Sequence, residues 1–173
     1  MRFTAVVCGA LALAGTVAHA DGGTASDLCQ SALRKAALPE AVALCSRAVD
    51  ANPADARALT HRGGAFLALA QFERAYEDLA RSAALDDGNP LTFYNLGVYF
   101  DKTKNPEKAV EAYSTAIRLS PGNPVGYYNR AKAYERLCRS GEALRDYQKI
   151  REIAPGMASA RAIPTSVEAC SSN

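Results

Sequence analysis

The chain has 173 residues, of which 49% are hydrophobic and 22% are charged, enough apolar material for one packed core. This composition excludes an intrinsically disordered protein, in which few apolar residues accompany a high net charge. The net charge of +2 gives no reason to expect a nucleic-acid partner, because phosphate binding needs a concentrated basic surface.

Residues 1–20 have the pattern of a cleavable signal peptide. Arg2 precedes an apolar run over residues 5–17 that is too short to cross a bilayer, and residues 18–20 supply a small-x-small cleavage pattern. We therefore expect cleavage after Ala20 and a periplasmic or secreted protein, with no membrane insertion after the signal is removed. The alternative is an N-terminal helix buried in the core.

An internal repeat organises the rest of the chain. From about residue 22 the sequence aligns with itself at a period of 34 residues, in the blocks 22–55, 56–89, 90–123 and 124–157. Apolar or small residues recur at positions 4, 8 and 11 of most blocks, and again at positions 20, 24 and 27. These spacings place them on one face of two successive helices. The third block carries the clearest set: Phe93, Leu96, Gly97, Phe100, Ala109, Tyr113, Ala116 and Pro121.

The two helices of each block are predicted to pack closely. Gly97 and Ala131 occupy position 8, and Ala109 and Ala143 occupy position 20. We expect these small residues to face one another, which lets the two helix backbones approach. The large aromatic residues at positions 4, 11 and 24 would then fill the space around that contact.

Turns and prolines mark where these helices end. The segments 104–107 and 139–142 are predicted to be the turns inside the third and fourth blocks. Pro121 and Pro155 are expected to end the second helices, because proline lacks the backbone N–H and clashes inside a helix.

Four blocks in one register resemble the tetratricopeptide repeat (TPR) family. The resemblance implies an all-α fold, a right-handed superhelical stack of helical hairpins with about four repeats over residues 22–157 and a concave groove. Residues 158–173 would form a C-terminal cap or tail, in which Pro164 interrupts a fifth first helix. The first block departs most from the pattern.

Four cysteines remain after signal cleavage: Cys29, Cys45, Cys138 and Cys170. An even number in an exported chain permits two disulfides. Cys29 and Cys45 occupy positions 8 and 24 of the first block, which line facing sides of one hairpin. Because first helices of neighbouring repeats run parallel in the family, the resemblance also brings Cys138 near Cys170. We therefore predict the pairs Cys29–Cys45 and Cys138–Cys170; the alternative is four buried thiols.

No constellation of residues predicts catalysis. His61 is the one histidine after residue 20, and it is interpreted as a solvated imidazole at the groove edge. Acidic residues of the second helices, such as Asp78 and Glu111, are interpreted as a solvated outer face. Neither a metal-ligand spacing nor a phosphate-binding loop is present in the sequence. We predict no enzyme activity, no cofactor and no metal.

The resemblance implies that positions 2, 5, 6, 9, 12 and 13 of the first helices line the groove. A Tyr-Asn pair recurs there one repeat apart; tyrosine offers contact area at low entropy cost, and asparagine can both donate to and accept from a peptide backbone. The predicted partner-binding residues are Tyr94, Asn95, Asp101, Tyr128, Asn129, Lys132 and Arg136.

The function implied is a scaffold for protein–protein interaction that holds an extended peptide or a partner helix. One alternative is a structural subunit that assembles envelope complexes or self-associates through its terminal repeat faces. Another is that the seven residues only stabilise neighbouring helices.

Overall fold

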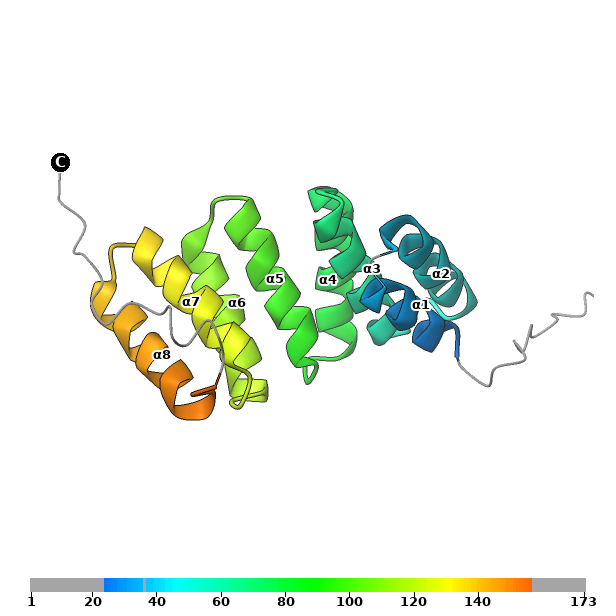
Figure 1. Cartoon of the computed structure of the whole chain (residues 1–173). Coiled ribbons are helices and arrows are strands. Elements are labelled where there is room, and N and C mark those ends of the chain that lie inside the picture. The colour runs from blue at the N-terminus through cyan, green and yellow to red at the C-terminus, as the bar shows by residue number, and fades with distance from the viewer. Residues whose placement is uncertain (1–23, 36, 157–173) are drawn as a thin grey trace, which may run out of the picture.

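The computed structural model describes residues 24–35 and 37–156. These residues form eight helices, paired as four hairpins that follow one another from α1 to α8 (Figure 1), and no strand. The helices are α1 (Ala25–Arg34), α2 (Leu38–Ala51), α3 (Ala56–Ala68), α4 (Phe72–Leu85), α5 (Pro90–Lys102), α6 (Pro106–Leu119), α7 (Pro124–Arg136) and α8 (Ser140–Ile153). Within the described residues, no helix has the length and apolar character needed to cross a bilayer. The predicted signal peptide and the cap or tail, with Pro164 and Cys170, lie outside the described residues.

The helix starts follow from their capping residues. The side chain of Asp55 accepts from the N–H of Ala58, and Asn89 and Asn123 cap α5 and α7 in the same way from the residue before Pro. Such side chains satisfy amide groups that have no partner within the helix. Proline at the first helical position is tolerated because its missing N–H would be unpaired there.

The first helices of the second, third and fourth repeats end alike. Ala70, Lys104 and Cys138 have φ values of 55°, 60° and 59°, in the left-handed region. At each site, two backbone hydrogen bonds close the helix end, such as Asn105 N–H to the carbonyl of Phe100 at 2.8 Å and Lys104 N–H to that of Asp101 at 3.2 Å. The turns are therefore shorter than predicted. Residues 106–107 and 140–142 already belong to α6 and α8, because Pro106 suits a first helical turn.

A small residue opposite a large one brings the helices of each hairpin together. A Cβ atom on Gly63 would lie 2.7 Å from Leu79 Cγ, and one on Gly97 would collide with the ring of Tyr113. Position 8 thus packs against position 24 as well as near position 20, where a Cβ on Gly63 would lie 3.3 Å from the carbonyl oxygen of Ala75. The large side chain of the second helix needs the room that glycine leaves.

In the first hairpin, two cysteines lie at the contact between the two helices. Cys29 and Cys45, both fully buried, form a disulfide with Cα atoms 4.8 Å apart. They occupy the positions of Gly63 and Leu79 in the next hairpin. The predicted pair is brought together by the antiparallel arrangement of α1 and α2. Cys138 lies at the end of α7, and its predicted partner Cys170 is outside the described residues.

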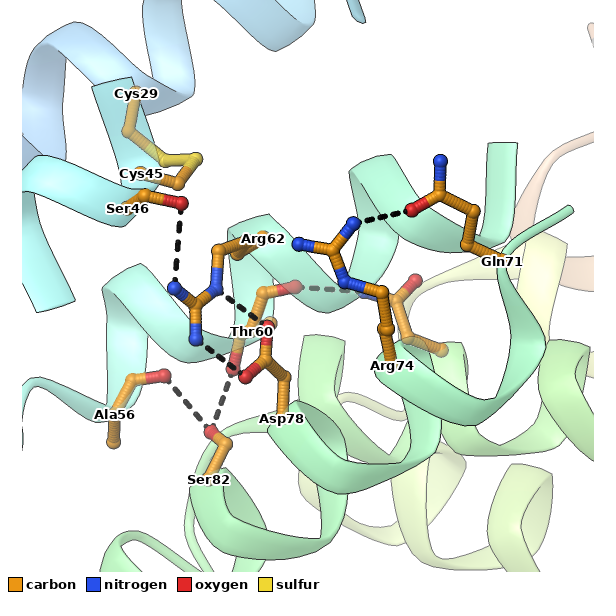
Figure 2. A network of polar contacts seen from close by, with 11 residues as sticks. Cys29, Cys45, Ser46, Ala56, Thr60, Arg62, Gln71, Arg74, Asp78 and Ser82 are labelled. Atoms are coloured by element: carbon orange, nitrogen blue, oxygen red, sulfur yellow. Dashed lines mark hydrogen bonds and ion pairs between the residues drawn. A yellow bond between two sulfur atoms is a disulfide. The ribbon is translucent and has the colours of Figure 1, made fainter. Parts of the chain in front are cut away.

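A half-buried arginine joins neighbouring hairpins. Arg62 on α3 donates to Asp78 on α4 from Nε and Nη2, at 2.7 and 2.8 Å, and to Ser46 on α2 from Nη1 at 3.3 Å (Figure 2). Asp78 is buried, so its interpretation as a solvated outer residue was wrong. A carboxylate can be buried here because the guanidinium meets both of its oxygens.

Candidate partner-binding surface

All seven residues that the sequence predicts for partner binding lie on α5 and α7, and two of them, Tyr128 and Arg136, are exposed. Tyr94, Asn95 and Asp101 lie on α5, and the other four lie on α7. The two helices belong to successive hairpins and are linked by side-chain hydrogen bonds. The structure shows which of the seven residues are used in those links.

The recurring asparagine joins one first helix to the preceding one. Asn129 donates from Nδ2 to the hydroxyl of Tyr94 at 2.9 Å, and Asn95 donates to the backbone carbonyl of Thr60 at 3.4 Å. Both asparagines are half-buried. Their amide groups therefore link neighbouring first helices.

Asp101 lies between a cation and a phenol. Arg136 donates from Nη1 to Asp101 Oδ1 at 2.7 Å, and the hydroxyl of Tyr113 donates to Oδ2 at 3.1 Å. Burial raises the pKa of Asp101, although Arg136 opposes that shift. Burial, with the negative charge of Asp101 nearby, also raises the pKa of Tyr113. Tyr113 therefore stays a neutral hydrogen-bond donor.

Glu135 occupies the same place in the fourth hairpin. Its Oε1 accepts from the hydroxyl of Tyr147 at 2.6 Å, and Lys132 on the same helix donates to Oε2. Burial alone would raise the pKa of Glu135, but the hydrogen bonds from Lys132 and Tyr147 lower it overall. The carboxylate thus remains charged and is held on the inner side of α7.

Tyr128 is the most accessible aromatic residue among the predicted seven. Its side chain is 39% exposed, and its ring lies against Tyr147, with ring centroids 6.2 Å apart. Arg136 is exposed as well, whereas Lys132 is partly exposed. These three residues can meet a partner without first giving up a buried contact.

His61 does not line an open edge. It is buried in α3, and burial together with the nearby Arg57 lowers its pKa, so the imidazole is neutral near pH 7. The interpretation of His61 as solvated was wrong, because α1 packs beside α3 in this region. No group of His, Cys, Asp and Glu in the described part of the chain could hold a metal ion.

A pocket of about 270 Å³ opens where α5 and α7 begin, above the end of α6. Its lining is mainly apolar, and Leu91 and Val125 are each 40% exposed at its mouth. The lining residues are Pro90, Leu91, Tyr94, Ala116, Ile117, Ser120, Asn123, Val125 and Gly126.

The preceding junction differs from the one that holds this pocket. There, the equivalent positions hold Thr60, Ser82 and Thr92, whose hydroxyls fill the space and bond to one another at 2.6 to 3.2 Å. At the α5–α7 junction these positions hold Tyr94, Ala116 and Gly126. Ala116 and Gly126 carry no hydroxyl group and line the pocket, in which Ile117 Cγ1 lies 3.1 Å from where a Cβ on Gly126 would be.

Of the seven predicted residues, Tyr94 alone lines this pocket. Leu91 and Val125 lie at groove position 2 but were not selected, and Ile117 and Gly126 lie outside the groove positions. The available signal was a difference between blocks, Gly126 where the preceding block has Thr92. A pattern of recurring residues does not reveal a position at which one block has a smaller residue than the others.

Comparisons with known proteins agree with this architecture. The family model of the TPR repeat matches residues 104–137, which contain α6 and α7. No curated protein matches the chain in sequence.

Solved structures share the fold at low sequence identity. TTC0263, a thermophilic TPR protein of Thermus thermophilus, has a TM-score of 0.71 and 19% identity, over 80% of this chain and 76% of its own. The MamA protein has a TM-score of 0.68 and 22% identity, over 79% and 74%. YrrB, described as a TPR protein with an unusual peptide-binding site, has a TM-score of 0.66 and 19% identity, over 79% and 70%.

The helical hairpins, the 34-residue period, the repeat match and the shared fold agree. The chain has the fold of tetratricopeptide repeat proteins, and residues 104–137 match the repeat itself.

Proposed function

We propose that this protein binds a segment of a partner protein along the surface of α5 and α7, with the pocket at their first turns as the main contact. Five large hydrophobic residues of the described chain are notably exposed, and three of them, Leu91, Val125 and Tyr128, lie on these two helices. Exposed apolar residues gathered beside an apolar pocket are typical of an interaction site.

The hydrogen bonds between α5 and α7 support this function. The Asn129–Tyr94 and Arg136–Asp101 hydrogen bonds fix α7 relative to α5 before a partner arrives. A preformed surface loses little conformational freedom on binding, so more of the contact energy remains as affinity. YrrB shares the fold and has a peptide-binding site, which is consistent with this use of the scaffold.

An affinity capture tests the proposal. The protein and a variant with Leu91→Glu and Tyr128→Glu are used to capture partners from an extract of the native cells. We expect the variant to lose the partner at least tenfold, because two charges replace apolar contacts. A matched control reverses two exposed charges on α6, with Glu111→Lys and Arg118→Glu, and should retain it. Equal recovery by the Leu91/Tyr128 variant would place the binding site elsewhere.

We also propose that the protein is exported. The pattern of residues 1–20 and the buried Cys29–Cys45 disulfide support this, because disulfides persist mainly in oxidising compartments. The mass of the protein purified from its native cells tests the idea. A mature chain that begins at Asp21 is expected, and an intact chain that begins at Met1 would contradict export.

A further inference from the structure

We infer that the partner segment is acidic and carries one apolar side chain, which enters the α5–α7 pocket while its acidic residues meet the far ends of the same helices. This inference rests on the proposed function and names the chemistry of the ligand. It follows from the direction in which the charged side chains of α5 and α7 point, and from the shape and lining of the pocket.

The ion pairs of this surface present their cations outward. In the Arg136–Asp101 pair the side chains are 51% and 15% exposed, and in the Lys132–Glu135 pair they are 44% and 22% exposed. Both carboxylates are turned inward, because each also accepts a hydrogen bond from a tyrosine of the second helix.

Lys102 adds to the outward positive charge. It lies at the end of α5, is exposed, and makes no ion pair within the described residues. A partner therefore meets the charges of Lys102, Lys132 and Arg136 on the solvent side, whereas Asp101 and Glu135 are less exposed than the cations they pair with. Such a surface favours a negatively charged segment through complementary charge.

The pocket selects an apolar group. Leu91, Ile117 and Val125 supply aliphatic walls, and the Tyr94 hydroxyl is already engaged with Asn129. A charged group placed there would lose its hydration without finding an ionic partner. The volume of about 270 Å³ is sufficient for a side chain of the size of leucine, methionine or phenylalanine.

The helix geometry sets the spacing within the ligand. Lys102 lies eleven positions after Leu91, and Arg136 lies eleven positions after Val125. This corresponds to about 16 Å along a helix. An extended peptide that follows the helices covers that distance in about five residues. The apolar residue and the acidic residues should therefore lie about five positions apart.

A selection from a library of displayed random 12-residue peptides tests the inference without assuming a sequence. Peptides enriched on the protein should carry aspartate or glutamate about five residues from a leucine, methionine or phenylalanine. Their affinity should fall at least tenfold in the Gly126→Thr variant, which fills the pocket as Thr92 fills the preceding junction. It should also fall at least fivefold in Lys102→Glu and weaken as salt is added, because exposed charges are screened.

Further variants separate loss of the pocket from loss of the fold. A Cβ on Gly126 would lie 3.1 Å from Ile117 Cγ1, so threonine requires a small shift of that side chain. Leu91→Ser removes one wall without adding atoms and should weaken the same peptides. Arg118→Glu on α6 carries the same charge reversal as Lys102→Glu and should leave their affinity unchanged. Circular dichroism and melting curves verify that each variant is folded.

The outcomes separate this inference from the proposed function. Enriched peptides that need Leu91 but lack acidic residues would overturn the inference while supporting binding on α5 and α7. Peptides that bind the Gly126→Thr and Lys102→Glu variants as well as the unsubstituted protein would also overturn it. A selection that enriches nothing would exclude a linear acidic segment, whereas the capture with the Leu91/Tyr128 variant would still decide the proposed function.

Discussion

Arg130 donates two hydrogen bonds to Asp146, at 2.8 and 2.7 Å, and so joins the helices of the fourth hairpin. A third bond, to Ser114 at 2.9 Å, reaches the second helix of the third hairpin. Arg62, Asp78 and Ser46 form the same arrangement two repeats earlier. This arginine-centred connection thus occurs at alternate junctions, and the junction between them has Leu96, Ala112 and Ala80 in these places.

The Arg130–Asp146 pair should be costly to break but replaceable as a whole. Asp146→Ala leaves a half-buried guanidinium without its partner, and we expect a loss of about 3 kcal/mol of unfolding free energy. The joint variant Arg130→Leu, Asp146→Ala, Ser114→Ala introduces the residues found at the equivalent positions, Leu96, Ala112 and Ala80. It should recover most of that loss, as measured by urea unfolding. A joint variant no more stable than Asp146→Ala would show that the apolar solution does not transfer between junctions.

The Cys29–Cys45 disulfide should be replaceable by the packing used in the second hairpin. The double variant Cys29→Ser, Cys45→Ser should lose roughly 3 kcal/mol, because the cross-link no longer restricts the unfolded chain and two hydroxyls are buried. Cys29→Gly with Cys45→Leu copies Gly63 and Leu79 and should restore part of the stability even under reducing conditions. Thermal melting with and without reductant measures both effects. Equal melting temperatures of the serine variant and the oxidised protein would contradict a stabilising role.

Lys104 has a left-handed backbone that glycine would adopt at lower cost. Its φ is 60°, its side chain is exposed, and it follows the end of α5. Lys104→Gly should stabilise the protein by about 0.5 to 1 kcal/mol, because a side chain in this conformation is strained. Glu111→Gly, at an exposed site inside α6, is the matched control and should destabilise by about 1 kcal/mol. The two melting temperatures should move in opposite directions; a decrease for Lys104→Gly would contradict the strain.

His61 should make the stability depend on pH. Its pKa in the folded state is lower than the ordinary value of 6.5, because burial and the nearby Arg57 disfavour the charged imidazole. Between these two values the unfolded chain binds more protons, so stability is complete above pH 6.5 and falls as the pH decreases through this window. His61→Gln should reduce the change in melting temperature between about pH 7.5 and 5.5. An unchanged difference would show that His61 does not carry it.

The sequence places residues on the surface of α5 and α7, but it does not predict which of their side chains bond to one another. Tyr94 and Asn129 recur at groove positions, but their bond to each other depends on how α7 lies against α5. The inward orientation of Asp101 and Glu135 likewise depends on the tyrosine hydroxyls of α6 and α8. Side chains from neighbouring repeats meet at distances that the spacing of residues within one helix does not set.

The sequence alone determined the hairpins and their register. The local features are a period of 34, a small residue at position 8 of every block and a proline at position 32 of three of the four blocks. The tertiary structure alone decided what each junction contains. The hydroxyls of Thr60, Ser82 and Thr92 fill one junction, and Gly126 leaves the next one open. That difference comes from atoms of three helices that share one space, and packing between helices is a property of their combined volume.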